Sequence, residues 1–497
     1  MNIKRALLFL AIVLIVSQVF SQTGYTSKCK EAFSNIGALR FEEAEKLLEE
    51  ERQVNPDNRV IFFLEDYIDF LKVFISEKEA LYEKALDRRK KRLKKIDELP
   101  DSNPFKNYLK GEIYLRWASV KGKMNSKFSA IMDINKAYRL LKENHREFPE
   151  FVPGQAGLGI LEIVIGTIPG KYDWITNLLN LEGTIGGGKK RIKYLFEISQ
   201  SDPSWSFLEY STLFMMSFIE MNTQQAIDEE IMNRYKAYDS AGILKNQPLL
   251  VFSYANLLQK KRMNEKALTV LNYYKNDSKQ YPFYHLDYMK GLAYLFKNSQ
   301  KCLFYFDSYL KDFPGRHYIK SSYQKKAWYY LLNGDTARYK SYIHYAGTRG
   351  EDYIGADKGA DNEAESNVIP NVHLLKARLM FDGGYYQKAL EALGRFDKKG
   401  RRAIELTEWY YRKGRIYHEK GNLDTAMKAY NKTYDIGKDL EAYFAANSAL
   451  MAGQILEKKN QPEKALEQYN RALDLSGFEY ELSIHQKAKA GKSRILD

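Results

Sequence analysis

Residues 410–430 read YYRKGRIYHEKGNLDTAMKAY, and residues 449–469 read ALMAGQILEKKNQPEKALEQY. The two stretches share one spacing of small, turn-forming and aromatic residues, at Gly414, Gly421, Ala426 and Tyr430 and again at Gly453, Asn460, Ala465 and Tyr469. The glycine or asparagine in the middle predicts a left-handed turn that ends one helix. The small residues before and after that turn allow two antiparallel helices to approach closely. Each stretch therefore predicts a helical hairpin.

The second half of the same pattern recurs earlier in the chain. A small residue is followed four residues later by a large one and eight residues after that by a proline, at Ala44, Leu48 and Pro56, at Ala137, Leu141 and Pro149, and at Cys302, Phe306 and Pro314. The proline is expected to end each helix. A single hairpin cannot cover its own apolar face, so hairpins must stack. The sequence thus predicts an all-α fold, an α-solenoid of stacked antiparallel helical hairpins.

The C-terminal pattern resembles a known repeat family. Tyr410, Gly414, Tyr417, Ala426 and Tyr430 are similar to the signature of the tetratricopeptide repeat. Lys413 departs from the leucine that is usual in this family, and offsets of 39 and 37 residues between units exceed the family's length of about 34. The resemblance implies irregular repeats and a shared scaffold rather than a shared activity.

The segment 154–188 is rich in glycine. Its run from Gly157 through Trp174 to the triple glycine at 186–188 resembles the tetratricopeptide-repeat thirty-nine and inclusion-body-clearance family, whose members are associated with lipid or protein homeostasis. The sequence from Gly183 to Lys189 also resembles the pattern of a phosphate-binding loop, but Lys190 stands where that pattern needs serine or threonine. Such a loop also follows a buried strand, and helices are predicted here. We therefore expect a turn that leads into a helix.

The chain is expected to contain four segments. Residues 1–21 resemble a signal peptide, with a basic start, an apolar run and a cleavage site before Gln22. A membrane anchor is the alternative, but the apolar run is shorter than the roughly 20 residues that a spanning helix needs. Residues 22–346 should form an N-terminal and central repeat-like helical region, 347–370 an acidic, partly helical loop between repeats, and 371–497 the C-terminal repeats with a capping helix. The predicted location is the periplasm or the outer membrane.

The formal charge is +14, and it falls to +12 if residues 1–21, with Lys4 and Arg5 and no acid, are removed. A moderately basic, exported protein suits anionic partners or membrane surfaces, and export argues against nucleic acid as a partner. The run from Arg88 to Lys95 is interpreted as the solvated face of a helix, with an electrostatic contact to an acidic partner or lipid as the alternative. Cys302 is expected to be a small buried residue, although a bridge to Cys29 stays open.

No pattern of catalytic residues occurs in the sequence. The seven histidines are scattered, and neither the paired histidines and cysteines of metal sites nor the serine turn of hydrolases is present. The acidic segment 347–370 lacks the spacing of a calcium loop. We therefore predict no catalytic residue, metal or cofactor, and a hydrolase is the least favoured function.

Four residues are predicted to bind a ligand. In the repeat family, the residue after the central small position faces the concave groove, which places Arg378 and Arg415 there, with Tyr411 and His418 beside Arg415. Arginines spaced along a groove suit carboxylates of chain termini or acidic segments. The alternative for each arginine is an ordinary solvent-facing side chain. The predicted function is a non-enzymatic exported scaffold for a protein or peptide partner, and the alternative is a peripheral envelope protein that binds lipid or cell wall.

Overall fold

The computed structural model describes residues 24–168, 179–222, 227–274 and 279–496. This part of the chain contains 24 α-helices and no strand, which confirms the predicted all-α class. The predicted signal peptide and Trp174 lie outside the described residues. In the described ranges, no helix is both long enough and apolar enough to cross a bilayer.

The chain forms two compact units. Unit 1 consists of Met1–Lys261, Glu265–Lys290 and Asp307–His317, and unit 2 consists of Arg262–Asn264, Gly291–Phe306 and Tyr318–Asp497. Three helices have residues in both units, namely α14 (Asn264–Leu271), α15 (His285–Leu295) and α16 (Lys301–Asp312).

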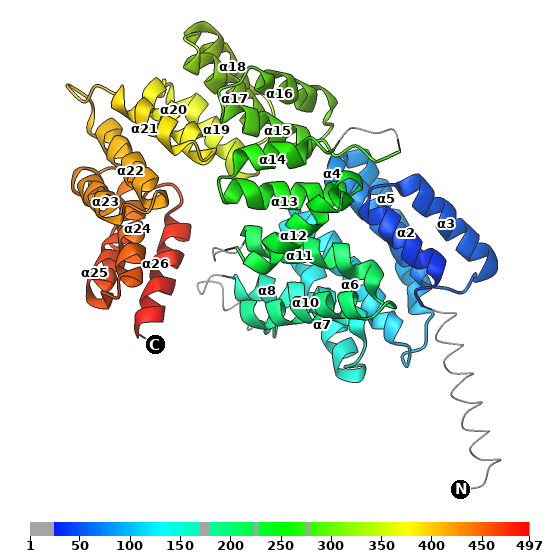
Figure 1. Ribbon diagram of the computed structural model, residues 1–497. Coiled ribbons are helices and arrows are strands. Elements are labelled where there is room, and N and C mark those ends of the chain that lie inside the picture. The colour runs from blue at the N-terminus through cyan, green and yellow to red at the C-terminus, as the bar shows by residue number, and fades with distance from the viewer. Residues whose placement is uncertain (1–23, 169–178, 223–226, 275–278, 497) are drawn as a thin grey trace, which may run out of the picture. The chain divides into compact units, whose positions relative to one another are not determined.

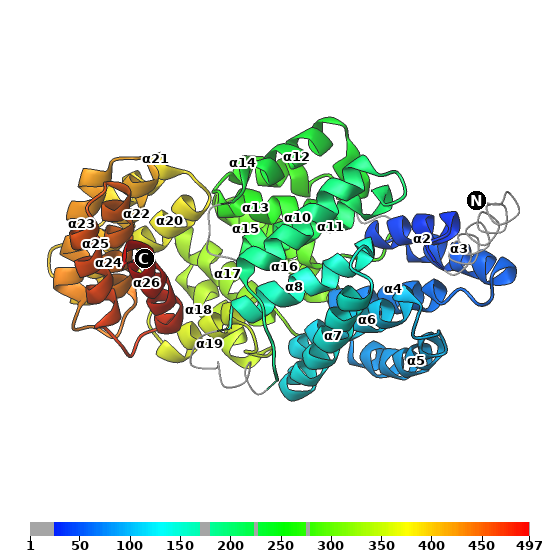
Figure 2. The same cartoon turned by 90° about the horizontal axis from the view of Figure 1, so that it is seen from below.

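The remaining helices of unit 1 follow one another as a series of hairpins (Figures 1 and 2). They are α2 (Ser27–Gly37), α3 (Phe41–Val54), α4 (Val60–Ser76), α5 (Glu79–Asp97), α6 (Pro104–Lys123), α7 (Lys127–Glu147), α8 (Gln155–Gly166), α10 (Ile185–Ser201), α11 (Glu209–Asn222), α12 (Glu229–Ser240) and α13 (Pro248–Lys260). The hairpin of α6 and α7 lies along the edge of this unit next to α5 (Figure 2).

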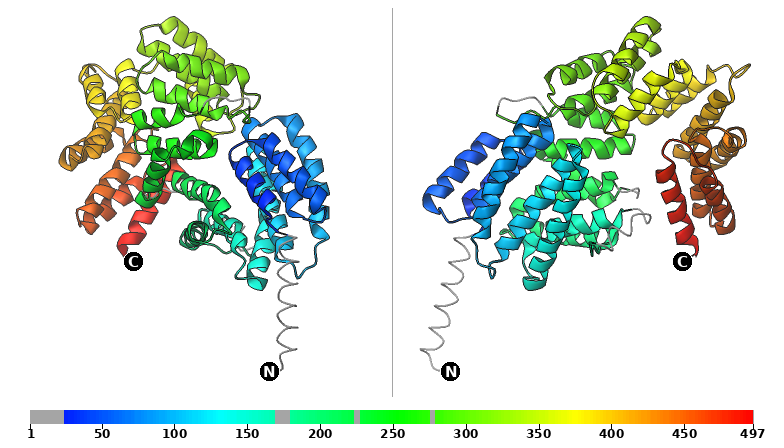
Figure 3. Two further views of the ribbon diagram at one scale, coloured as in Figure 1. Left: turned by 45° about the vertical axis from the view of Figure 1, so that its right-hand side comes forward. Right: turned by 180° about the vertical axis from the view of Figure 1, so that it is seen from behind.

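Unit 2 continues the same pattern. Its helices are α17 (Ile319–Leu332), α18 (Thr336–Thr348), α19 (Gly355–Ser366), α20 (Val372–Asp382), α21 (Tyr386–Gly394), α22 (Ala403–Glu419), α23 (Leu423–Gly437), α24 (Phe444–Lys458), α25 (Pro462–Leu473) and α26 (Glu481–Leu496). The last five form one stack, drawn orange to red (Figures 1 and 3). The predicted capping segment forms α26, which packs on α24 and α25.

The two C-terminal hairpins have the close contact that their glycines predicted. A Cβ atom added to Gly414 on α22 would lie 2.6 Å from the ring of Tyr430 on α23, and one added to Gly453 would lie 2.6 Å from the ring of Tyr469. Gly421 and Asn460 have positive φ angles of 77° and 53°, so both predicted left-handed turns are confirmed. The tyrosine ring therefore lies directly against the glycine backbone.

The same contact occurs in the earlier hairpins. A Cβ atom added to Gly111 would lie 2.6 Å from the side chain of Leu141 on α7. One added to Gly291 would lie 2.7 Å from the ring of Phe306 on α16. Cys302 is fully buried one turn before Phe306, at the place of the repeat alanine, as predicted. The recurring spacing thus marks the second helix of a hairpin throughout the chain.

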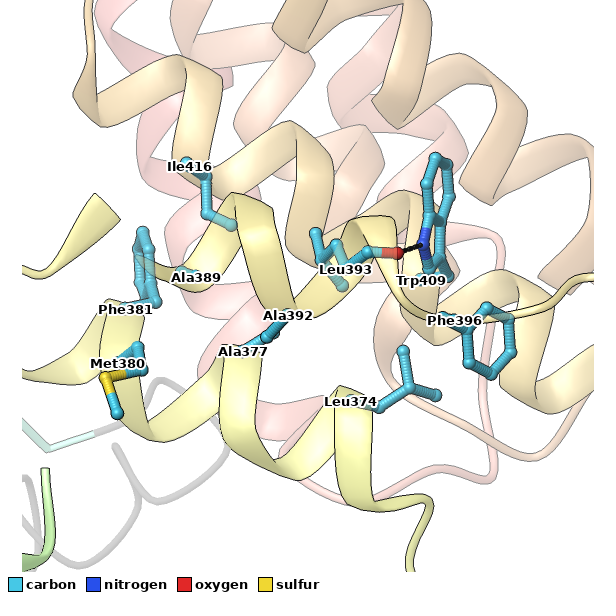
Figure 4. Packing of buried hydrophobic residues seen from close by; sticks show 10 residues of the cluster. All are labelled: Leu374, Ala377, Met380, Phe381, Ala389, Ala392, Leu393, Phe396, Trp409 and Ile416. Atoms are coloured by element: carbon cyan, nitrogen blue, oxygen red, sulfur yellow. Dashed lines mark hydrogen bonds between the residues drawn. The ribbon is translucent and has the colours of Figure 1, made fainter. Parts of the chain in front are cut away.

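A buried cluster joins α20, α21 and α22 in unit 2. Its members are Leu374, Ala377, Met380, Phe381, Ala389, Ala392, Leu393, Phe396, Trp409 and Ile416 (Figure 4). The indole N–H of Trp409 donates to the carbonyl of Leu393 at 2.9 Å, which satisfies a polar group inside this apolar core. Because one cluster includes residues from three helices, it fixes α20 and α22 side by side.

The acidic segment 347–370 is less loop-like than its composition suggests. It contains α19, which packs on α17 and α18. Asp357 is fully buried and accepts hydrogen bonds from the backbone N–H groups of Tyr318 (2.6 Å) and Ser321 (2.8 Å) at the start of α17. Asp361 pairs with Lys320 on α17 at 2.8 Å. Asp357 and Asp361 are therefore used inside the fold.

The glycine-rich segment brings α8 and α10 together. A Cβ added to Gly188 would lie 2.3 Å from the carbonyl oxygen of Gly159, so the two backbones are in direct contact. The side chain of Thr184 accepts from the N–H of Gly187 and begins α10. In the described residues the segment lacks the strand that a nucleotide-binding loop requires, and its glycines serve helix packing.

Candidate functional site

The first helices of successive hairpins in unit 2 lie next to one another. α17 contacts α20, α20 contacts α22, and α22 contacts α24. Three of these helices carry a cationic side chain that lies over an aromatic ring of its own or of the preceding first helix: Lys325 on α17, Arg378 on α20 and Arg415 on α22. We call these three residues the basic row.

Arg378 is held by an aromatic ring of the preceding first helix. The centre of its guanidinium group lies 5.0 Å from the ring of Trp328 on α17. Its nearest ion pair is a loose one, with Nε 4.0 Å from the carboxylate of Asp382, and 43% of the side chain is exposed. The positive charge of Arg378 is therefore accessible and only weakly neutralised.

Arg415 is held in the same manner one helix further along. Its guanidinium group lies 4.3 Å from the ring of Phe381 on α20 and 5.7 Å from the ring of Tyr411 on its own helix. Among the described residues, no carboxylate forms an ion pair with Arg415. Cation–π contacts fix the guanidinium plane and leave its N–H edge able to bind an anion.

Lys325 completes the row. The sequence contains no signal for it, because Lys325 lies two residues before the small residue Ala327, whereas the repeat pattern marks the residue after it. Its ammonium group lies 3.7 Å from the ring of Trp328, so this ring contacts both Lys325 and Arg378. Burial, together with the charge of Arg378, lowers the pKa of Lys325 to about 7, although Glu363 and two nearby aspartates oppose the shift. The charge on Lys325 is thus sensitive to pH near neutrality.

Trp328 is fixed by the acidic segment. Its indole N–H donates to both carboxylate oxygens of Glu363 on α19 at 3.0 Å. The hydroxyl of Tyr339 on α18 donates to the same carboxylate at 3.0 Å. These contacts hold the ring that supports two of the three cations.

Tyr411 and His418, predicted to flank Arg415, occupy different environments. Tyr411 is only 2% exposed, and its hydroxyl accepts from the side-chain amide of Asn447 on α24 at 2.6 Å. It therefore lies beneath Arg415 as a support. His418 packs on Tyr430 of its own hairpin, with Nδ1 3.3 Å from the hydroxyl, and burial lowers its pKa. The binding roles of these residues stay predictions.

Aromatic side chains lie beside the basic row. The ring of Tyr443, just before α24, is 5.7 Å from the ring of Tyr411 and 5.5 Å from that of Tyr480. Tyr480 is 54% exposed, and neighbouring Leu482 is 48% exposed. Burial raises the pKa of Tyr443, and Arg378 and Arg415 both partly oppose the shift. Tyr443 therefore lies within electrostatic reach of both arginines.

The basic run of α5 in unit 1 is only partly the solvated face that we expected. Arg88 binds both oxygens of Asp69 at 2.7 Å, and Arg92 binds Asp69 at 2.6 Å. Arg89 is buried and pairs with Asp133 on α7 at 2.9 Å. Sequence periodicity could not reveal these pairs, because the acids belong to other helices.

Residues 405–476, which comprise most of the stack from α22 to α25, match the family model of the tetratricopeptide repeat. The chain carries tetratricopeptide repeats. This repeat is a scaffold that presents a surface to protein partners, and it is typically non-catalytic. In the part of the chain that the structure describes, no group of three or more metal-ligating side chains is found.

Solved structures of similar chains cover most of the sequence. They include the APC/C hetero-tetramer Cut9-Hcn1 (13% identity, TM-score 0.29, 97% of this chain and 99% of that chain) and a human IFIT1 dimer with PPP-AAAA (14%, 0.31, 93% and 94%). Yeast Tom70 is similar at 12% identity and a TM-score of 0.23, with 94% of this chain and 88% of that chain covered. No curated protein matches the sequence significantly. The specific resemblance of segment 154–188 stays an expectation.

Proposed function

We propose that this protein is an exported, non-enzymatic tetratricopeptide repeat scaffold that binds an acidic segment of a partner protein along the basic row. One observation carries the proposal: Arg378 and Arg415 rest on aromatic rings, and among the described residues the one carboxylate paired with either arginine is that of Asp382, 4.0 Å from Nε of Arg378. An arginine held in this way is pre-oriented for a ligand carboxylate.

The surroundings of the row favour a peptide over a single small anion. The cations lie on successive helices, so an extended segment can meet them one after another. Tyr480 and Leu482 offer exposed apolar surface to side chains of the same segment. The preferred ligand is thus a segment, or a chain terminus, that combines carboxylates with apolar residues.

The location in the cell envelope is also proposed, from the pattern of residues 1–21. Mass spectrometry of the protein purified from its native cells should find a mature N-terminus at Gln22. Fractionation should recover the protein in the periplasm or with the outer membrane. A mature chain that retains residues 1–21 would contradict export by cleavage.

The binding proposal is tested with the double variant Arg378→Ala/Arg415→Ala. Partners are first captured from an envelope fraction, and synthetic peptides of their acidic segments are then titrated by fluorescence anisotropy. We expect the double variant to lose at least about tenfold in affinity, since hydrogen bonds to charged groups contribute about 1.5–3 kcal/mol each.

A matched control removes two exposed arginines outside the row, Arg338 and Arg402, which are 65% and 62% exposed. This variant has the same net charge as the test variant and should keep wild-type affinity. Equal affinities of the two double variants for the peptides would contradict the proposed site.

A further inference from the structure

A second charged site lies in unit 1, between α5, α6 and α7. Residues of these helices line an open pocket of about 420 Å³. Six cationic side chains line it, and only two carboxylates do, so it has a formal excess of four positive charges. The cations are Arg89, Lys90, Lys94, Lys110, Lys121 and Lys136, and the carboxylates are Asp97 and Asp133.

The deepest charges of this pocket are not balanced. Asp133 accepts from Arg89 at 2.9 Å and pairs with Lys121 at 2.7 Å through the same oxygen. The exposed fractions of these three side chains are only 6% to 11%. One buried carboxylate thus faces two buried cations. An uncompensated buried charge is unfavourable, so this arrangement favours a further anion nearby.

Arg89 also has unused hydrogen-bonding capacity. Its side chain is 8% exposed, and its Nε–H is buried without a hydrogen-bond partner. The guanidinium group is held 4.8 Å from the ring of Tyr114 and 5.7 Å from the ring of Trp117. A buried donor without a partner is unfavourable, which marks this arginine as arranged for more than packing.

Three flexible cations line the same pocket. Lys90 and Lys94 are exposed on α5, and Lys136 is exposed on α7 with its ammonium group 5.3 Å from the ring of Tyr114. Within the described residues, no carboxylate forms an ion pair with Lys90, Lys94 or Lys136. In contrast, Lys110 pairs with Asp97. The three lysines are therefore available to a ligand.

We propose that this pocket binds a small polyanion that carries two or more phosphate groups, as a free diphosphate or as part of a lipid headgroup. Its volume is within the range of small-molecule sites, about 300–1,000 Å³. Phosphate groups supply several acceptor oxygens and more than one charge in a small space, which matches a fixed arginine surrounded by lysines. This site is in unit 1 and does not depend on the proposed peptide-binding role of unit 2.

The test uses the full mature chain and two triple variants of equal net charge. The pocket variant is Lys90→Gln/Lys94→Gln/Lys136→Gln. The control variant is Lys46→Gln/Lys84→Gln/Lys91→Gln, which changes exposed lysines of α3 and α5 that do not line the pocket. All six positions are exposed, so both variants are expected to fold, and circular dichroism checks this.

Inorganic pyrophosphate is titrated by isothermal calorimetry, with inorganic phosphate for comparison. In parallel, sedimentation is measured with vesicles of phosphatidylcholine alone and of phosphatidylcholine mixed with cardiolipin, whose headgroup carries two phosphate groups. We expect pyrophosphate to bind more tightly than phosphate, and the pocket variant to bind at least about tenfold more weakly than the control variant. Binding should also weaken as sodium chloride is added.

The outcomes separate the sources of the phosphate. Pyrophosphate binding that the pocket variant loses supports a free ligand. Sedimentation only with cardiolipin, lost in the pocket variant, supports a lipid headgroup. Equal losses in both triple variants, or a wild-type chain that binds neither pyrophosphate nor the acidic vesicles, would overturn the proposal. Each result leaves the peptide titrations of unit 2 unaffected, so the two proposals fail separately.

Discussion

Lys325 shows how one side chain can make binding depend on pH. With its pKa lowered to about 7, it is charged below neutrality and largely neutral above. A bound carboxylate would favour the charged form and raise this pKa again. Binding of an acidic peptide should therefore take up a proton at pH values between the free and the bound pKa.

The resulting prediction concerns the affinity of an acidic peptide for the basic row. Affinity should fall as the pH rises above about 7, by up to about tenfold per pH unit until the bound pKa is reached. The variant Lys325→Arg keeps its charge over this range and should bind with little pH dependence. Fluorescence anisotropy from pH 6 to about 9 measures both curves, and a flat wild-type curve would exclude this role of Lys325.

Glu77 is a second residue whose environment predicts a pH effect, in this case on stability. It is 4% exposed, lies with one carboxylate oxygen 2.9 Å from Nδ1 of the His317 ring and pairs with Lys123 at 2.8 Å. Burial raises its pKa, but the hydrogen bond with the His317 ring and the charge of Lys123 outweigh burial and leave the pKa at about 2. The lowered pKa means that ionised Glu77 stabilises the fold above its unfolded pKa.

We predict that Glu77→Gln lowers the free energy of unfolding at pH 7 by about 3 kcal/mol, because it leaves buried partners without a carboxylate. The contribution of Glu77 should be lost as the pH falls from about 4.5 to about 2, so wild type and variant should converge there. Urea unfolding at neutral and acid pH measures the difference. A constant difference at all pH values would show that ionisation of Glu77 is not its cause.

At the scale of the helix, the hairpin depends on one contact between a glycine and an aromatic ring. Gly414 lies against Tyr430 so closely that a methyl group would overlap the ring. Helix propensity alone would favour alanine here by about 1 kcal/mol. The packing of α22 on α23 therefore outweighs the intrinsic preference of α22.

This contact predicts opposite effects for two glycine-to-alanine changes. Gly414→Ala should destabilise unit 2 by about 1–3 kcal/mol through overpacking. Gly394→Ala at the end of α21, where a Cβ meets no atom within 4 Å, should be neutral or stabilise by up to about 1 kcal/mol. Thermal unfolding monitored by circular dichroism compares them. A stabilising Gly414→Ala would mean that the two helices can separate at little cost.

Across the described part of the molecule, contacts are mostly within hairpins and between neighbouring hairpins. α24, for example, contacts α22, α23, α25 and α26. In such an architecture, stability is roughly a sum of local terms, and one weakened hairpin opens without the rest. The division of the chain into two compact units further limits the cooperativity of unfolding.

We therefore predict a local effect of Gly453→Leu, which places a large side chain against Tyr469. Amide hydrogen exchange should increase in α24, α25 and α26, whereas α2 to α7 of unit 1 should be unchanged. Mass spectrometry of peptic fragments measures both regions in one experiment. Faster exchange throughout unit 1 would show that the chain unfolds as a single cooperative body.

Much of the architecture was predictable because its determinants are local. Gly414, Gly421, Ala426 and Tyr430 lie within two adjacent helices, so their spacing alone predicts the turn and the close contact. The same spacing predicted that Arg378 follows a small core residue. That residue, Ala377, is fully buried. The contact of Arg378 with the ring of Trp328 was not predictable, since Trp328 belongs to a different hairpin.

The sequence by itself determined the helices, their left-handed turns and the stacking of hairpins, because these follow from residue spacings within one or two turns of helix. Only the tertiary structure showed that Lys325 and Arg378 contact the same indole ring. It also showed that acidic side chains of α19 bind groups of α17, and that residues of α5, α6 and α7 line a cationic pocket. These features join side chains from different hairpins. Because the repeats differ in length, the spacing of residues within one hairpin does not predict which side chains of neighbouring hairpins come into contact.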